Sequence, residues 1–203
     1  MNQRITGQSI TIAMIIGVSV LMFSCFGKTP PAAFYTLSSL QKGDVQDRIS
    51  QKLSIAIGPV TLPPEMDRPQ IITRDHESRI TLSEFHRWAG PLQEGITSVL
   101  SANLSTLLGT DRIMSRNHEN IFPFTHHVVL NINRFDGQLQ GDVLLDVTWV
   151  IQESRNPEPL IVKRSVIHEP VLSNDYNGLV AAQSKALSEL SREIAASLRT
   201  IRE

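Results

Sequence analysis

The sequence is poor in cysteine and carries little excess charge of either sign. Its 203 residues include one cysteine, Cys25, so no disulfide can form within the chain and the core alone must hold the fold. Lysine and arginine (19) nearly balance aspartate and glutamate (20), and no segment concentrates the basic residues. Because nucleic-acid-binding proteins carry a basic patch or stripe, this balance argues against a nucleic-acid partner.

The motifs of common enzyme and metal sites are also missing. The chain has no GxGxxG, GxxxxGK[ST] or GxSxG sequence, and no His-Glu pair is followed by the second histidine of a zinc-protease helix. His126 and His127 are adjacent, and on a strand their side chains would point to opposite faces. We therefore predict no catalytic residues, no metal and no cofactor other than covalent lipid, with a cryptic hydrolase as the least favoured alternative.

One long hydrophobic run is present, and it stands near the start of the chain. Residues 10–23 (ITIAMIIGVSVLMF) follow Arg4 and end just before Ser24 and Cys25. A run of this length is short for a hydrocarbon core of ~30 Å, but it is typical of the apolar region of a signal peptide. We predict that residues 1–24 are a signal peptide; the alternative is a permanent N-terminal anchor helix.

The end of this run resembles a bacterial lipobox, in which a small residue precedes a cysteine that receives diacylglycerol. The residues concerned are Leu21-Met22-Phe23-Ser24-Cys25. We predict that Cys25 becomes the lipid-carrying first residue of the mature protein, followed by a tether up to residue 33. Phe26 stands where an Asp would resemble an inner-membrane retention signal, which favours the outer membrane with the folded part facing the periplasm. Eight tether residues reach at most ~28 Å.

Residues 34–203 are predicted to form a single domain. Strands are expected at 34–37, 53–57, 71–74, 79–82, 128–134, 143–151 and 160–168, the last three as an antiparallel meander. One helix should span 91–108, between a proline and a glycine, and a second about 175–201, capped by Ser173 or Asn174. The pattern predicts an α/β (α+β) two-layer sandwich, in which a mixed sheet of about seven strands carries both amphipathic helices on one face.

Four segments together resemble the PqiC/YmbA family of ABC-transport auxiliary lipoproteins. They are Phe34 to Leu37, Ile57 to Ile71 (beginning Ile-Gly-Pro-Val), Trp88 to Leu104, and the helix Tyr176 to Ala195. The resemblance implies a periplasm-facing outer-membrane lipoprotein that serves an MCE-domain protein anchored in the inner membrane, in a system that moves lipids between membranes. It also implies a small α/β sandwich that self-associates.

The proline-rich stretch from Gly58 to Arg74 has two interpretations: a stiff connection between strands, or a surface that contacts another protein. We favour contact with a partner or a second copy, and the residues expected to carry it are Leu62, Pro63, Met66, Arg68, Arg74 and Trp88. For Trp88 alone, a core position is the simpler reading. The predicted function is a non-enzymatic docking subunit that supports envelope integrity. The alternative is a stand-alone periplasmic lipoprotein that binds a small apolar ligand.

Overall fold

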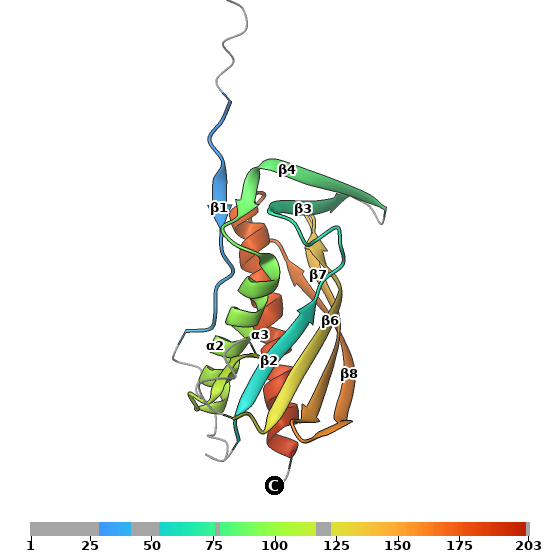
Figure 1. Cartoon of the computed structure of the whole chain (residues 1–203). Helices are drawn as coiled ribbons and strands as arrows, with labels where there is room; N and C mark the ends of the chain where they lie inside the picture. Colours follow the sequence, from blue (N-terminus) through green and yellow to red (C-terminus); the bar gives the residue numbers. More distant parts are fainter. Residues whose placement is uncertain (1–28, 42–52, 76–77, 117–122, 202–203) are drawn as a thin grey trace, which may run out of the picture. The chain divides into compact units, whose positions relative to one another are not determined.

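A computed structural model describes residues 29–41, 53–75, 78–116 and 123–201 (Figure 1). The chain divides into two compact units, Met1–Pro31 and Ala32–Glu203, and the second holds every described helix and strand. The predicted signal peptide and Cys25 lie outside the described residues. Within the described ranges, no helix combines the length and the apolar character needed to cross a membrane.

The larger of two sheets has five strands in the order β5-β2-β6-β7-β8. These strands are β2 (Ile55–Thr61), β5 (Ile113–Ser115), β6 (His126–Gly137), β7 (Asp142–Glu153) and β8 (Asn156–Pro170). β6, β7 and β8 form the predicted antiparallel meander, whereas β2 runs parallel to both of its neighbours. The sheet is therefore mixed, as the sequence predicted.

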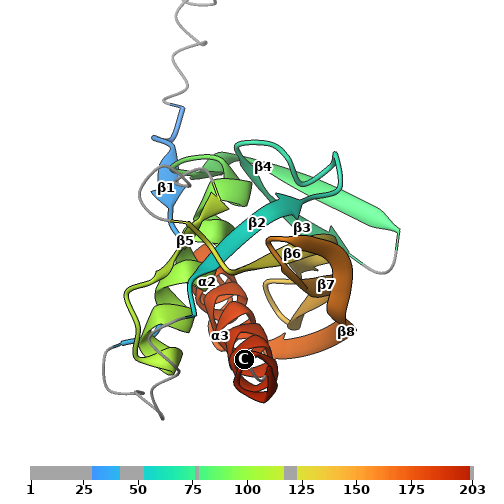
Figure 2. The ribbon, with the colours of Figure 1, turned by 60° about the horizontal axis from the view of Figure 1, so that its bottom comes forward.

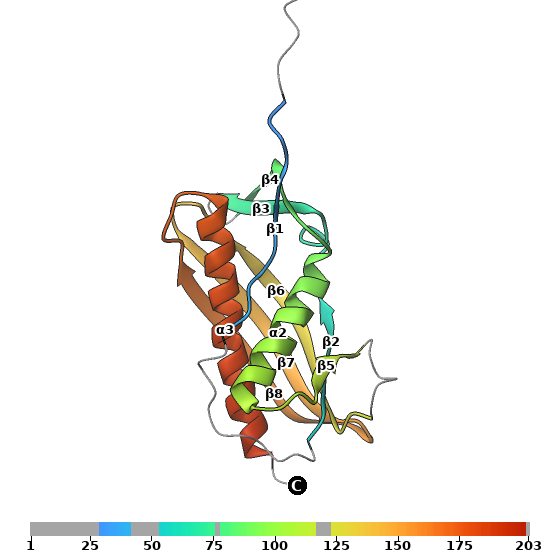
Figure 3. The same ribbon diagram turned by 90° about the vertical axis from the view of Figure 1, so that its left-hand side faces the viewer.

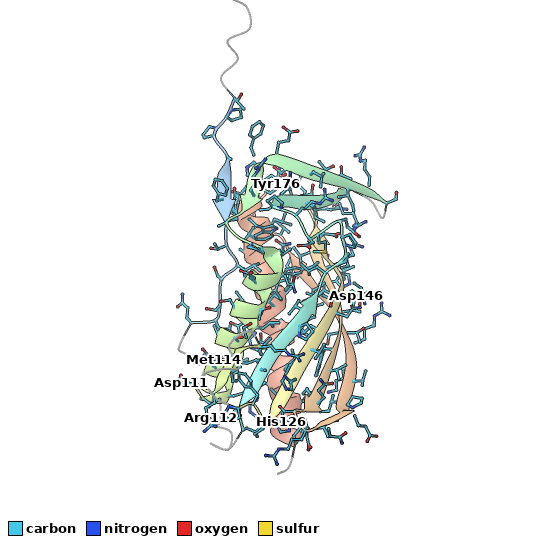
Figure 4. All side chains as sticks on the ribbon, viewed as in Figure 1. Asp111, Arg112, Met114, His126, Asp146 and Tyr176 are labelled. Carbon is cyan, nitrogen blue, oxygen red and sulfur yellow. The ribbon has the colours of Figure 1, made fainter. Side chains whose placement is uncertain are left out.

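Two helices cover one face of this sheet. α2 (Leu92–Leu108) and α3 (Tyr176–Thr200) lie side by side over it in Figure 3, and Figure 2, which looks along α3, shows both on the same side. Alternation along β7 explains the arrangement, because Val147 and Trp149 are fully buried under the helices. The intervening residues, such as Asp146, lie on the opposite face (Figure 4). The predicted mixed α+β class, with two helices on one sheet face, is confirmed.

The strands divide into two sheets rather than one, and the described residues contain eight strands. β1 (Ala33–Tyr35), β4 (Arg79–Trp88) and β3 (Gln70–Asp75) form a separate sheet in the order β1-β4-β3. Pro63, Pro64 and Pro69 separate β2 from β3, and because proline has no N–H to donate, the ladder of the large sheet does not continue there. β5 escaped prediction because its three residues are too few to show a period.

The helix boundaries agree with prediction, but the cap of α3 does not. Asp175, rather than Ser173 or Asn174, is the N-cap, and its carboxylate accepts a hydrogen bond from the Gly178 amide at 2.8 Å. Ser173 supports the cap indirectly, because its hydroxyl donates to Asp175. The amide hydrogen bond is the main reason that the pKa of Asp175 lies below its ordinary value. Gly109 follows the end of α2, as predicted, and the structure shows it in the left-handed conformation.

The segment that follows β1 is bound to both helices. The Ser38 amide donates to the Ser184 hydroxyl of α3, and the Leu40 amide donates to the side-chain oxygen of Asn103 in α2 at 2.7 Å. Asn103 is fully buried and donates in turn to the Ser191 hydroxyl of α3. The N-terminal segment is thus fixed to the helical layer.

Candidate functional site

A groove of about 1060 Å³ lies between α2 and the β5-β2 edge of the large sheet. The sheet contributes Gly58, Pro59, Val60 and Met114, and the last of these lies close to α2 in Figure 4. The facing side of α2 contributes Glu94, Thr97, Ser98 and Ser101. The sheet wall of the groove is mainly apolar but ends in Ser115 and Arg116, and the wall from α2 carries hydroxyl and carboxylate groups.

The groove exists because β5 covers only the first part of the β2 edge. β5 pairs with Ile55, Ala56 and Ile57, and no described strand pairs with residues 58–61 on this side. On the other side, the register between β2 and β6 shifts between Ile57 and Val60. Gly58 has φ of +114°, a conformation that residues with a Cβ rarely adopt, and the Gly58–Pro59 peptide bond is cis. The irregularity of β2 at Gly58 thus lies where β5 ends and the open edge of the groove begins.

An open strand edge inside a groove is suited to an extended peptide. A peptide backbone can hydrogen-bond with the open groups of residues 58–61, among which Pro59 offers only its carbonyl, while the peptide's side chains meet the short hydroxyls of Thr97, Ser98 and Ser101. Glu94 at the first turn of α2 is exposed and favours a cationic residue at that end. A small apolar ligand would instead need an enclosed, mainly apolar cavity, and this groove is open and about half polar.

The predicted contact residues of the proline-rich stretch fall into two groups. Leu62, Pro63 and Arg68 are half-buried at the surface. Met66 and Trp88 are only 3% and 7% exposed and belong to the core. A turn in which the Met66 amide donates to the Pro63 carbonyl directs the methionine inward. The expectation that Met66 is presented to a partner is therefore corrected, and Trp88 takes the simpler core position.

Arg74 is held in a buried ion-pair cluster. Its guanidinium approaches Asp136 of β6 at 2.7 Å, and Arg134 binds the other carboxylate oxygen at 2.8 Å. The Asp136 side chain has no exposed surface. The hydrogen bond with Asp136 is the main reason that the pKa of Arg74 is raised. Since Arg74 lies on β3, the cluster joins the small sheet to the large one.

The two adjacent histidines have separate partners. His126 Nδ1 hydrogen-bonds with the Thr125 hydroxyl and His127 Nε2 with the Ser154 hydroxyl, both at 2.9 Å. Burial is the main reason that the pKa of His126 lies below its ordinary value. Across the part of the chain that the structure describes, no group of three His, Cys, Asp or Glu side chains is placed to hold a metal ion.

The family model for ABC-type transport auxiliary lipoprotein components matches residues 35–195. The chain belongs to this family. The match includes α2, most of α3 and the whole groove, and it starts only ten residues beyond Cys25. Membership makes the protein a transport auxiliary lipoprotein and agrees with the resemblance found in its sequence. No curated protein matches the chain.

Two solved structures share the fold of this auxiliary lipoprotein. A crystal structure of an uncharacterized protein has a TM-score of 0.69 and 16% identity, covering 83% of this chain and 99% of its own. Protein XCC0632 from Xanthomonas campestris, of the family DUF330, has a TM-score of 0.65 and 12% identity, covering 82% and 95%. At such low identity the likeness concerns the fold alone.

Three of the segments that resemble the auxiliary lipoprotein family meet at one end of the domain. Tyr35 of β1 pairs in register with Trp88 of β4, and its ring lies 6.4 Å from that of Tyr176, the first residue of α3. His86 of β4 stacks on Tyr176 with ring centroids 3.9 Å apart. Burial, followed by the nearby charge of Asp175, raises the pKa of Tyr35. Figure 4 shows Tyr176 beside β1 and β4.

Two features of the site were missed from the sequence. The groove depends on where β5 ends relative to β2, which requires the pairing of strands far apart in the chain. The ion-pair cluster did leave a local signal, because Arg134 and Asp136 lie two apart on a strand and so can face the same side.

Proposed function

We propose that this auxiliary lipoprotein is a non-enzymatic docking subunit at the outer membrane for an MCE-type, ABC-linked system that transports lipids between membranes. The observation that carries the proposal is the family match over 35–195, which includes a groove with an open strand edge. A docking subunit needs a surface that recognises a partner, and β2 and α2 provide one. Envelope integrity would depend on that contact.

Anchoring is the second part of the proposed role. Cys25 would carry the covalent lipid, and β1 begins at Ala33, so the tether holds the domain within ~28 Å of the membrane surface. A bacterial lipoprotein carries three acyl chains, more than the two signals that make anchoring stable. We expect Cys25→Ala to release the protein into the periplasm and to abolish its function. A soluble variant with wild-type activity would remove anchoring from the proposal.

We propose that the partner, an MCE-domain protein, places an extended segment in the groove. The segment would add a strand to the β2 edge at residues 58–61, and Leu62, Pro63 and Arg68 would extend the contact beyond the end of β2. Backbone hydrogen bonds would supply much of the affinity. The side chains of α2 that face the groove would select the sequence. We also expect the chain to self-associate.

Affinity purification of the full-length protein from gently solubilised envelopes, followed by mass spectrometry, tests this role. Ser98→Arg places a long cation in the groove and should abolish recovery of the MCE-domain protein. Ala102→Arg adds the same side chain one helical turn further along α2, at an exposed position outside the groove lining, and serves as the matched control. Equal recovery by both variants would exclude the groove as the docking surface.

The same purification separates the proposal from the alternative role. A protein that binds a small apolar ligand itself would come without a protein partner and with non-covalent lipid. That lipid would survive removal of the covalent anchor. Recovery of an MCE-domain protein, together with a groove free of co-purified lipid, would support docking.

A further inference from the structure

The two most exposed large apolar side chains in the described part of the chain lie near one end of the domain. Leu172 is 91% exposed and Phe34 is 65% exposed. Phe34 belongs to β1, and Leu172 stands in the short connection between β8 and α3. Single apolar side chains are common on protein surfaces, so the shared location of these two is the informative observation.

Contacts around Tyr176 bring their two segments together. Tyr176 is the first residue of α3 and follows Leu172 closely in the chain, and its ring lies 6.4 Å from that of Tyr35 in β1. The Val171 amide donates to the Gly141 carbonyl at 2.9 Å, which adds the connection between β6 and β7 to the same end. We call this part of the domain the β1 end, and its segments are residues 32–37, 137–141 and 170–174.

The three segments of the β1 end carry no formal charge. Although 19% of the whole chain is charged, none of them contains Lys, Arg, Asp or Glu. Asp175, which follows the third segment, is held in the cap of α3. On the small sheet, which lies at the same end in Figure 1, Asp75 and Arg79 pair with each other at 2.7 Å. The opposite end is different, because Figure 4 shows Asp111 and Arg112 there.

The length of the tether decides which end of the domain can reach a membrane. α3 has 25 residues, so it extends about 37 Å from Tyr176 at the β1 end toward the opposite end. The tether between Cys25 and β1 reaches at most ~28 Å. If the opposite end faced the bilayer, β1 would lie farther from the membrane surface than the tether can extend. The β1 end is therefore the end that the tether allows to touch the membrane.

We propose that the β1 end rests on the lipid bilayer, with Phe34 and Leu172 inserted at the boundary between headgroups and acyl chains. The proposal rests on the anchoring at Cys25 proposed above and adds an orientation to it. A bilayer is the partner because this end is uncharged, carries the most exposed apolar side chains and is held within reach by the tether. Tyr35 and Tyr176 suit the same place, since tyrosine combines an apolar ring with a polar hydroxyl.

The contact depends on the lipid anchor for its strength. Two inserted side chains bury little apolar surface, so we expect the domain without covalent lipid to bind membranes weakly. The tether keeps these side chains close to the bilayer and thereby raises their effective concentration at its surface. Insertion would then fix the orientation of the domain, with the end that carries Asp111 and Arg112 directed away from the membrane.

A fluorescent probe on single cysteines tests the orientation of the full-length lipoprotein. Because lipid occupies Cys25, Leu172→Cys provides one free thiol for the dye NBD, and Arg155→Cys provides one in the β7–β8 turn at the other end of the sheet. The vesicles contain phosphatidylethanolamine, phosphatidylglycerol and a lipid spin-labelled near its headgroup as the quencher. We expect the quencher to act about three-fold more strongly on the Leu172→Cys probe, because only that probe lies at the bilayer. Equal quenching would overturn the proposed orientation.

A charge at Leu172 gives an independent test, with the probe moved to Asn174→Cys. Leu172→Glu should reduce the quenching of this probe about two-fold, because a carboxylate stays in water. Val162→Glu is the matched control, since Val162 is 59% exposed but lies on β8 well before its end, and this change should leave the quenching as it was. Circular dichroism confirms that both variants fold. The same quenching in both variants would contradict insertion of Leu172.

Flotation of the vesicles on a density gradient separates this proposal from the anchoring on which it rests. A lipoprotein that does not float with the vesicles would refute the anchor at Cys25 and the orientation together. A lipoprotein that floats but shows equal quenching at its two ends would refute the orientation alone. Flotation with strong quenching only at the β1 end is the result that we expect.

Discussion

Replacing Asp136 with asparagine should loosen the small sheet from the large one before the rest of the domain unfolds. The carboxylate has no exposed surface and binds Arg74 and Arg134, whose side chains are 14% and 31% exposed. Removing one member of a fully buried ion pair costs about 3–5 kcal/mol. Because both arginines retain some contact with water and asparagine preserves one acceptor oxygen, we expect a loss of about 2–3 kcal/mol.

The two tryptophans of the chain allow this loss to be located. Trp88 ends β4 in the small sheet, and Trp149 is fully buried on β7 in the large one. Trp149→Phe leaves a fluorophore that reports on the small sheet, and Trp88→Phe leaves one that reports on the large sheet. In guanidinium titrations, Asp136→Asn should lower the midpoint reported by Trp88 more than the midpoint reported by Trp149, each compared with its own single-tryptophan parent.

A matched control is available on the uncovered face of the large sheet. Asp146 also pairs with an arginine, but that arginine is 64% exposed, and the pair lies within the large sheet. Asp146→Asn should therefore shift both midpoints little. If Asp136→Asn lowered both reporters equally, or behaved like Asp146→Asn, the cluster would not be the link between the sheets.

Three further changes have defined outcomes. Gly58→Ala should cost about 1–3 kcal/mol in chemical denaturation, because alanine is strained at φ +114°, whereas Gly90→Ala, which meets no atom within 4 Å, should cost much less. Met66→Ala should destabilise the fold by about 2–5 kcal/mol, whereas Leu172→Ala, at an exposed position, should have little effect. If the two variants had the same denaturation midpoint, the buried position of Met66 would be contradicted. Asp175→Ala should lower Tm at pH 7. Because the folded pKa of Asp175 is depressed, its contribution is present above its ordinary pKa of 3.8 and is lost as the pH falls through the folded value. The Tm difference should therefore shrink as the pH is lowered below 3.8, and a difference that stays constant across that range would contradict the capping role.

Periodicity was sufficient to predict most of the fold. The alternation from Val143 to Ile151 predicted β7, and the stripes of the two helices, ended by Gly109 in the case of α2, gave their positions within a few residues. The division into two sheets was not predictable in this way, because strand pairing depends on residues far apart in the chain. The role of Arg74 could not be predicted either, because it depends on contact with Asp136, which lies sixty-two residues away in the chain.

The candidate site was harder to predict from the sequence than the fold was. The proline-rich stretch was correctly singled out as unusual, but proline content does not say which side chains face outward. Met66 was expected at the surface and is buried, because the turn that begins at Pro63 directs it toward the core. The groove lies where β5 ends opposite Ile57 and where β2 is irregular at Gly58, and neither feature has a signature at the level of composition.

Site-specific photo-cross-linking in intact cells tests docking through the groove most directly. A photoreactive amino acid at Ser98 lies in the groove, and one at Arg164 lies exposed on β8, at the opposite edge of the large sheet. The account predicts that Ser98 captures an MCE-domain protein and that Arg164 does not. Capture at both positions, or at neither, would contradict docking through the groove.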